Sequence, residues 1–72
     1  MAQIKNQALL RKIALRIKLL REKKDITQEQ FYNDTGIHLG RVETGAMNIS
    51  VSTLDAICQY FNISLEDFFK GI

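Results

Sequence analysis

Apolar residues recur along the chain at helical spacing, and no stretch alternates with period two for long enough to indicate a strand. Residues 4–24 are rich in Leu, Lys, Arg and Ala, which favour helices, and we expect one long helix there. Its core-facing stripe is predicted from four residues spaced at i, i+4, i+8 and i+11: Leu9, Ile13, Ile17 and Leu20.

The second helix is expected to begin with a capping box. The hydroxyl of Thr27 can accept the amide of Gln30, and the Gln30 side chain can reach back. Downstream, Gly36 indicates a bend, and a stretch ending in Gly45 is typical of a helix stop. Residues 25–45 therefore have room for two short helices around a tight bend.

The last third of the chain predicts two more helices. Residues 51–61 are expected to form an amphipathic helix capped by Ser50, with one apolar face made of Leu54, Ile57, Cys58 and Phe61. Ser64 resembles a second cap, which opens a short helix through Phe69 or Lys70 that Gly71 ends. The prediction is an all-α fold of five helices in a single domain over 1–72, in which 1–12 extend the first helix.

Charge divides the chain into two unlike parts. The net charge is only +2, but residues 1–24 hold eight lysines and arginines against one glutamate, whereas residues 25–72 hold two against seven acidic residues. A basic end suggests a polyanion partner such as nucleic acid. The alternative is a solvated basic helix that partly neutralises the acidic remainder.

Other chemistry is nearly absent from the sequence. One cysteine allows no internal disulfide and favours a reducing, cytoplasmic setting; Cys58 is expected to be a buried core thiol. No apolar run approaches the roughly 18 residues of a membrane span, and the N-terminus is not a secretory signal. No catalytic constellation, metal site, cofactor site or small-molecule ligand is evident, so an enzyme is not expected.

Several motifs in order resemble one family. "IKLLREKKDITQEQF", then "RVETG", then "NISVSTLDAICQYFNISLEDFF" are similar to the XRE-type, λ-repressor-like helix-turn-helix proteins, over roughly residues 13–69. Each piece is weak alone, but the order and spacing are specific. The resemblance implies a DNA-binding transcriptional regulator, usually dimeric, with its third helix in the major groove of double-stranded DNA.

The chain departs from that family in the turn. About three residues are missing between the helix-two cap and the closing glycine. If Ile37 lay on the third helix, it would point about 160° away from Leu39, so it fits better in the turn, packed inward. The third helix is then only about 38–44, with Leu39 and Val42 on its buried face. Tyr32 also departs, because the family usually has a small residue there.

Candidate DNA contacts follow from the resemblance and from the outward positions of the third helix. Arg41 is the strongest candidate for base reading, because its guanidinium can bond guanine O6 and N7 together. The remaining candidates are Gln28, His38, Gly40, Thr44, Asn48, Lys23 and Lys24.

Each contact has a structural alternative. Arg41 could pair with a carboxylate such as Asp34, and Asn48 could bond its own backbone. His38 could be a surface or capping residue, and Gly40 a helix defect. Gln28 and the two lysines could simply be solvated.

Two further expectations concern structure. The resemblance implies an ion pair between Arg21 and Glu43, against the alternative of two independent surface charges. A second apolar stripe on the first helix lies away from the core stripe, where the family usually has polar residues. It predicts a dimer interface through Ile4, Ala8, Leu15 and Leu19.

Alternative occupants of that stripe remain open. It could meet Phe68, Phe69 and Ile72 of a partner chain, or this chain's own C-terminal tail could cover it. The rival function is a helix-turn-helix scaffold that dimerises or binds a partner protein without reading DNA. The acidic balance after residue 25 is its best argument.

Overall fold

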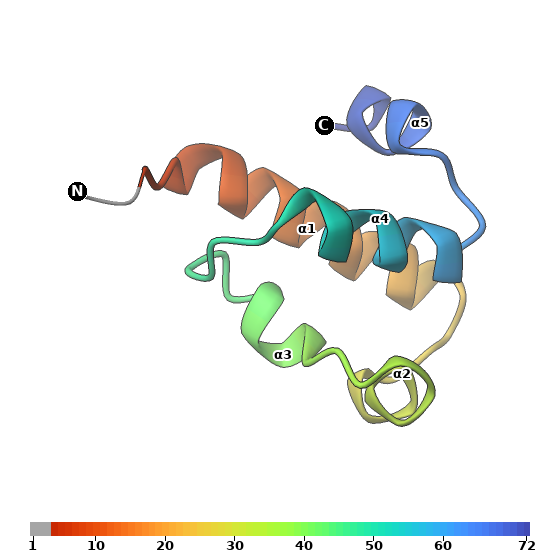
Figure 1. Ribbon diagram of the computed structural model, residues 1–72. Helices are drawn as coiled ribbons and strands as arrows, with labels where there is room; N and C mark the ends of the chain where they lie inside the picture. Colours follow the sequence, from red (N-terminus) through yellow and green to blue (C-terminus); the bar gives the residue numbers. More distant parts are fainter. Residues whose placement is uncertain (1–3) are drawn as a thin grey trace.

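A computed structural model describes residues 4–72, and all regular structure in this range is helical (Figure 1). The elements are α1 (Gln7–Lys23), α2 (Gln28–Thr35), α3 (Leu39–Val42), α4 (Val51–Tyr60) and α5 (Leu65–Lys70). The expected all-α fold with five helices and a long first helix is confirmed.

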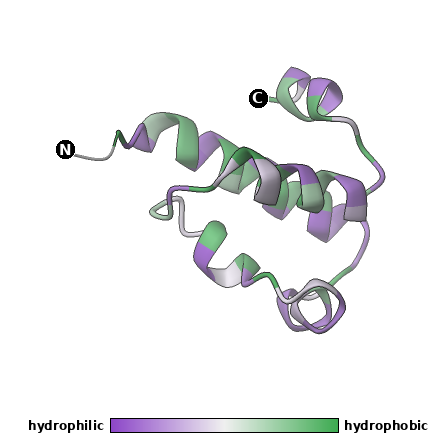
Figure 2. Ribbon diagram, in the orientation of Figure 1, coloured by the Kyte–Doolittle hydropathy of each residue, from purple (hydrophilic) through white to green (hydrophobic). Residues whose placement is uncertain are grey.

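The long helix α1 forms the spine of the molecule. In Figure 1, α2 and α3 lie on one side of α1 and α5 lies on the other. Apolar residues gather on the helix faces that meet in the middle, and polar residues occupy the outer faces (Figure 2). The α2–α3 pair is therefore held against α1 at one edge, with its outer face free.

Each of the five helices buries at least one apolar side chain completely. One such residue per helix belongs to a single core: Ile17, Phe31, Leu39, Ile57 and Phe68. Full burial of a Leu, Ile or Phe side chain stabilises a fold by about 1.5–3 kcal/mol relative to exposure. The four-residue α3 is therefore also attached to the core, through Leu39.

The predicted start and inner stripe of α1 were partly wrong. The helix begins at Gln7, because Asn6 adopts extended geometry and its Oδ1 accepts the amide of Leu9 at 3.0 Å. Leu9 is 40% exposed and Leu10 only 6% exposed. The core side of α1 carries Leu10, Ile13, Ala14 and Ile17. These four residues are spaced at i, i+3, i+4 and i+7, and Leu20 is only partly buried at the end of the face.

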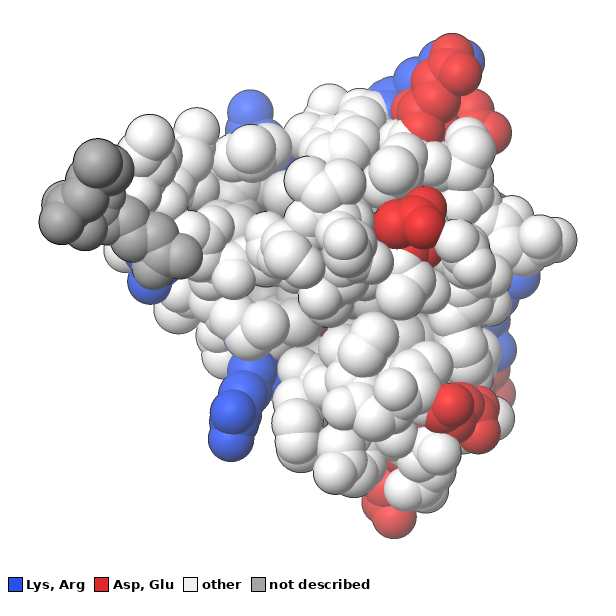
Figure 3. Space-filling model, in the orientation of Figure 1, with Lys and Arg blue, Asp and Glu red and all other residues white. Residues whose placement is uncertain are grey.

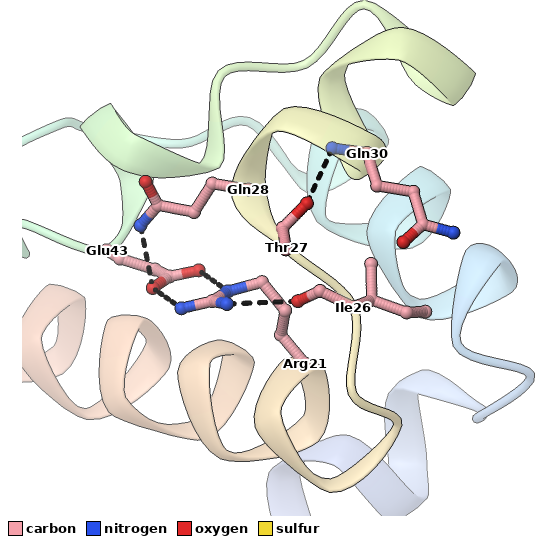
Figure 4. A network of polar contacts seen from close by, with 6 residues as sticks. All are labelled: Arg21, Ile26, Thr27, Gln28, Gln30 and Glu43. Carbon is pink, nitrogen blue, oxygen red and sulfur yellow. Dashed lines mark hydrogen bonds and ion pairs between the residues drawn. The ribbon is translucent and has the colours of Figure 1, made fainter.

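Hydroxyl caps open three of the helices as predicted. Thr27 accepts the amide of Gln30 at 3.0 Å, Ser50 that of Thr53 at 3.1 Å, and Ser64 that of Asp67 at 3.0 Å. The second half of the box at Thr27 was wrong. The Gln30 side chain points away from the cap (Figure 4), and within residues 4–72 it makes no hydrogen bond back to Thr27.

The bend between α2 and α3 has the predicted form. Gly36 adopts a left-handed conformation with φ of 77°, and its amide donates to the Tyr32 carbonyl at 2.7 Å. A side chain at that φ is strained, so glycine suits the position. Ile37 lies in the turn and packs on the core, while Leu39 and Val42 are buried. The prediction that the turn holds Ile37 and that α3 is short is confirmed.

Cys58 is buried as predicted. Loss of solvent around the thiol, followed by the nearby Asp55, raises its pKa. The thiol therefore stays protonated at neutral pH and acts as a small apolar core group.

Substitutions of the adjacent residues Leu9 and Leu10 test which of them lies on the buried face of α1. We expect Leu10→Ala to lower the free energy of unfolding by roughly 2–4 kcal/mol, because it leaves a cavity in the core. The matched change Leu9→Ala should cost less than about 1 kcal/mol, since that side chain is already partly solvated. Urea unfolding followed by circular dichroism measures both. Equal losses of unfolding free energy in the two variants would contradict the assignment of Leu10, and not Leu9, to the buried face of α1.

Candidate nucleic-acid interface

An ion pair joins α1 to the residue that ends α3. Arg21 Nε donates to Glu43 Oε2 at 2.8 Å, and Arg21 Nη2 donates to Glu43 Oε1 at 3.0 Å. The side chains are only 14% and 6% exposed. Two parallel hydrogen bonds fix the direction of both groups as well as their distance. Figure 4 shows the two side chains facing one another across the gap between α1 and α3.

The same pair also holds the start of α2. Arg21 Nη1 donates to the carbonyl of Ile26 at 3.0 Å, and Gln28 Nε2 donates to Glu43 Oε1 at 3.2 Å. The hydrogen bonds that Arg21 donates to Glu43 raise the pKa of Arg21, which favours the charged guanidinium. Three helix ends meet at one charged network (Figure 4).

The outer face of α3 carries the residues expected there. His38, Gly40, Arg41 and Thr44 are all exposed. The hydroxyl of Thr44 donates to the Arg41 carbonyl at 2.6 Å and accepts the amide of Ala46 at 3.2 Å. Thr44 therefore closes the end of α3 as well as facing outward.

Arg41 does not use its alternative partner. Asp34 instead accepts the hydroxyl of Tyr60 at 2.6 Å, a bond that raises the pKa of Tyr60. Within the described part of the chain, no ion pair or hydrogen bond engages the Arg41 guanidinium. This leaves a solvated planar cation on the outer face of α3.

A hollow of about 330 Å³ lies between the outer faces of α2 and α3. We call it the α2–α3 hollow; it is lined by Gln28, Glu29, Tyr32, His38, Leu39, Gly40 and Arg41. Gly40 has a definite role in it. A Cβ added there would lie 3.2 Å from Gln28 Oε1, so glycine lets the Gln28 side chain lie across α3 toward Glu43.

Tyr32 is a feature of this surface that the sequence did not place. Its ring stacks on His38 with the centroids 4.3 Å apart, and it is partly exposed. A large residue fits because it points outward along the hollow and not between the helices. One signal for this contact was present in the sequence: Tyr32 lies four residues before Gly36, and His38 lies two residues after it.

Asn48 and the two lysines lie apart from this cluster. Asn48 Nδ2 donates to the carbonyl of Ile4 at 2.9 Å, so it ties the segment before α1 to the loop before α4. The side chain does not make the bond to its own neighbouring backbone that was weighed from sequence, and its contact with a DNA phosphate stays a prediction. Lys23 and Lys24 are exposed at the end of α1.

The second apolar stripe of α1 is exposed, as its sequence suggested. Ala8 is exposed, and Leu15 and Leu19 are 59% and 52% exposed. Ile4 is 88% exposed but lies before the start of α1, so it does not share the helical stripe that was predicted to include it. Gly71 and Ile72 lie beside the two leucines around a hollow of about 160 Å³, so this chain's tail covers the stripe only in part. The idea that Phe68 meets a partner was wrong, because Phe68 is fully buried in its own core.

Residues 4–72 contain no group of three side chains suited to hold a metal ion. In the same range, no helix is both long and apolar enough to cross a membrane.

Comparison with known proteins agrees with this architecture. A family model described as Helix-turn-helix matches residues 17–68. The chain belongs to the XRE-type helix-turn-helix family, whose members are DNA-binding regulators. The resemblance stated from sequence motifs is confirmed.

One curated relative is similar over most of the chain. It is the protein named Antitoxin PezA from Streptococcus pneumoniae serotype 4 (strain ATCC BAA-334 / TIGR4), which is 41% identical over 58 residues. The match covers 76% of this chain but spans only 37% of the length of that relative. No solved structure matches.

The Arg21–Glu43 pair gives a prediction about stability. We expect Glu43→Ala to lower the free energy of unfolding by roughly 2–4 kcal/mol, between the cost of losing an exposed and a buried pair, because Arg21 is left shielded without its partner. The control Glu22→Ala removes an exposed carboxylate next to Arg21 in sequence. It should change the free energy of unfolding by less than about 0.5 kcal/mol. Thermal and urea melts report both. A Glu43→Ala melt that overlays the wild type would contradict the role given to this pair.

Proposed function

We propose that the chain is a sequence-specific DNA-binding regulator, most simply a repressor, that inserts the outer face of α3 into the major groove. The observation that carries this is the solvated Arg41 guanidinium on a helix whose position is fixed by the Arg21–Glu43 network. An arginine held at this place can bond guanine O6 and N7 together.

The short α3 limits how many bases one protomer reads. Four helical residues rise about 6 Å, less than two base-pair steps of a duplex. Base reading then depends on Arg41 and its outward neighbours His38 and Thr44. Gly40 adds no side chain of its own to this face, and the Gln28 amide lies beside it.

Contacts to the phosphate backbone would set the register. Gln28 stands at the first position of α2, and its amide group faces the hollow beside α3 while bonded to Glu43. Polar side chains and amides at a helix start are suited to phosphate oxygens. Lys23 and Lys24 supply positive charge just before that start, and Thr44 and Asn48 lie at the opposite end of α3.

The role of Arg41 can be measured by selection from random duplexes. Arg41→Ala should lose roughly 1–3 kcal/mol of discrimination at one or two base pairs, while salt-sensitive binding to random DNA persists. The control is Lys70→Ala, which removes a cation from α5 on the other side of α1 and should select the wild-type sequences. If Arg41→Ala also selects them, Arg41 is not a reader.

Binding of the wild-type protein to random duplex DNA also tests a second candidate function. The acidic balance after residue 25 and the exposed Leu15–Leu19 stripe favour a helix-turn-helix scaffold that binds a protein, and the antitoxin relative makes a toxin one such partner. Wild-type protein that fails to bind random duplex at low salt would favour that function over DNA binding.

A two-fold dimer is part of the proposal. The stripe of Ile4, Ala8, Leu15 and Leu19 would pack on a second copy along α1. Leu15 and Leu19 lie beside Ile72 in a hollow that Lys12 and Arg16 also line, and exposed apolar residues gathered in this way favour a protein partner. A dimer of this kind would hold two copies of α3 about 34 Å apart, one turn of DNA.

Charging the stripe should separate the two copies. Leu15→Glu with Leu19→Glu is expected to give a folded monomer by sedimentation, with at least tenfold weaker binding to a two-fold site because only one α3 engages at a time. Val51→Glu changes an apolar residue on α4 that is 73% exposed, more than either leucine, and should leave the dimer intact. Wild-type protein that sediments as a monomer at high concentration would rule the dimer out. The C-terminal residues Gly71 and Ile72 would then be all that covers the stripe.

A further inference from the structure

The first ten residues of α1 precede the part of the chain that matches the family. The match begins at residue 17, whereas α1 begins at Gln7. This added segment is firmly packed, since Leu10, Ile13 and Ala14 are buried against the rest of the molecule. It therefore forms a rigid support from which exposed side chains project in fixed directions.

Arg11 lies on this support, directly against the turn that follows α3. A Cβ built at Gly45 would lie 3.0 Å from Arg11 Cγ and 3.2 Å from Arg11 Cα. Gly45 is buried and has a φ of 74°, so the turn closes tightly over the arginine stem. The stem is thus held beside Thr44 and Ala46, at the edge of the surface proposed to face DNA.

The charged end of Arg11 has no structural task among the described residues. The other two arginines of α1 are occupied: Arg16 donates to the carbonyls of Phe68 and Asp67 at the end of the chain, and Arg21 pairs with Glu43. Arg11 is exposed, and over residues 4–72 it forms neither an ion pair nor a side-chain hydrogen bond.

The surroundings of Arg11 favour an anion. In Figure 3, the left part of the visible face shows Lys and Arg side chains without acidic ones, whereas the acidic side chains lie in the right part, where further Lys and Arg side chains accompany them. An anion that approaches the end of α3 therefore meets positive charge from α1 and α3 with no carboxylate between them on this face.

We propose that Arg11 binds a backbone phosphate of duplex DNA beside the turn that follows α3. This inference rests on the proposed function, and it extends the interface from the helix-turn-helix to the added segment of α1. A helix that lies in the major groove has phosphates along both of its sides, and a guanidinium at the end of α3 meets that rim. The planar fork can bond two phosphate oxygens at once, which a solvated lysine does not.

The neighbouring residue Lys12 provides a matched control. It is one position along the same helix, about 100° around it, and lines the hollow with Leu15, Leu19 and Ile72 on the α5 side. Arg11→Gln and Lys12→Gln each remove one positive charge from the same segment. Arg11→Gln also keeps the Cβ and Cγ atoms that touch Gly45, and its thermal melt should match that of the wild type.

The experiment is the affinity of each full-length variant for one duplex over a range of salt concentrations. Arg11→Gln should flatten the slope of log affinity against log salt by about 0.9 per bound protomer and weaken binding several-fold at low salt. Lys12→Gln should keep the wild-type slope. Because Lys12 lines the hollow beside the proposed dimer stripe, both variants are compared only after sedimentation shows the same oligomeric state as the wild type. The sequences selected from random duplexes should be unchanged for both, because phosphate contacts carry no base information.

Other outcomes would overturn the assignment in distinguishable ways. Equal slopes for the two variants, with wild-type DNA binding intact, would show that Arg11 makes no specific phosphate contact while the proposed function stands. A change in selected sequence for Arg11→Gln would make Arg11 a base reader. Absence of salt-dependent binding by the wild type would remove both the phosphate contact and the DNA-binding function.

Discussion

The two parallel hydrogen bonds between Arg21 and Glu43 are the constraint on which the α2–α3 surface depends. An isolated helix of four residues is far too short to be stable in water, because its nucleation cost exceeds the gain from so few hydrogen bonds. The position of α3 must therefore come from tertiary contacts. Leu39 and Val42 hold it from the core side, and Glu43 fixes its last turn to Arg21.

Besides Glu43 at the end of α3, three parts of the chain take part in this hydrogen-bond network. Arg21 contributes the end of α1, the Ile26 carbonyl the connection before α2, and Gln28 the first turn of α2. Gly40 belongs to the same arrangement, since a Cβ there would lie 3.2 Å from Gln28 Oε1 and would require that amide to shift slightly. A surface built in this way has little freedom to slide, so the point on α3 from which an exposed side chain such as Arg41 projects is set by the residues beneath it.

The long α1 explains how so small a molecule supports a reading surface. Its inner face supplies the core, and its flanks hold the two ends of the fold. Arg16 bonds the last turns of α5 on one flank, while Arg11 lies against the turn after α3 on the other. Short helices are thus attached to one long one: α2 and α5 each bury one phenylalanine, and α3 buries Leu39 and Val42.

Local chemistry made much of this fold predictable. The caps at Thr27, Ser50 and Ser64, the glycine bend at Gly36 and the inward place of Ile37 depend on a few neighbouring residues, which the sequence displays directly. The pairing of Arg21 with Glu43 was expected only because the motifs resemble a family.

The misses have a common physical origin. Leu9 and Leu10 differ by 100° around α1, and which of them is buried depends on where α4 and α5 pack. The contact of Asn48 with the Ile4 carbonyl joins residues 44 apart in sequence, and the outward stacking of Tyr32 on His38 needs the relative placement of two helices. Periodicity in a single segment contains none of this information.

The most direct test is a nuclear magnetic resonance titration of the labelled protein with a short duplex taken from the selected pool. We expect the largest amide shift changes at Gln28, across residues 38–45 and at Arg11, with little change along the Leu15–Leu19 stripe when the dimer is already formed. Saturating shifts that leave residues 38–45 unmoved and appear instead around Leu15, Leu19 and Ile72 would contradict DNA reading by the α2–α3 surface.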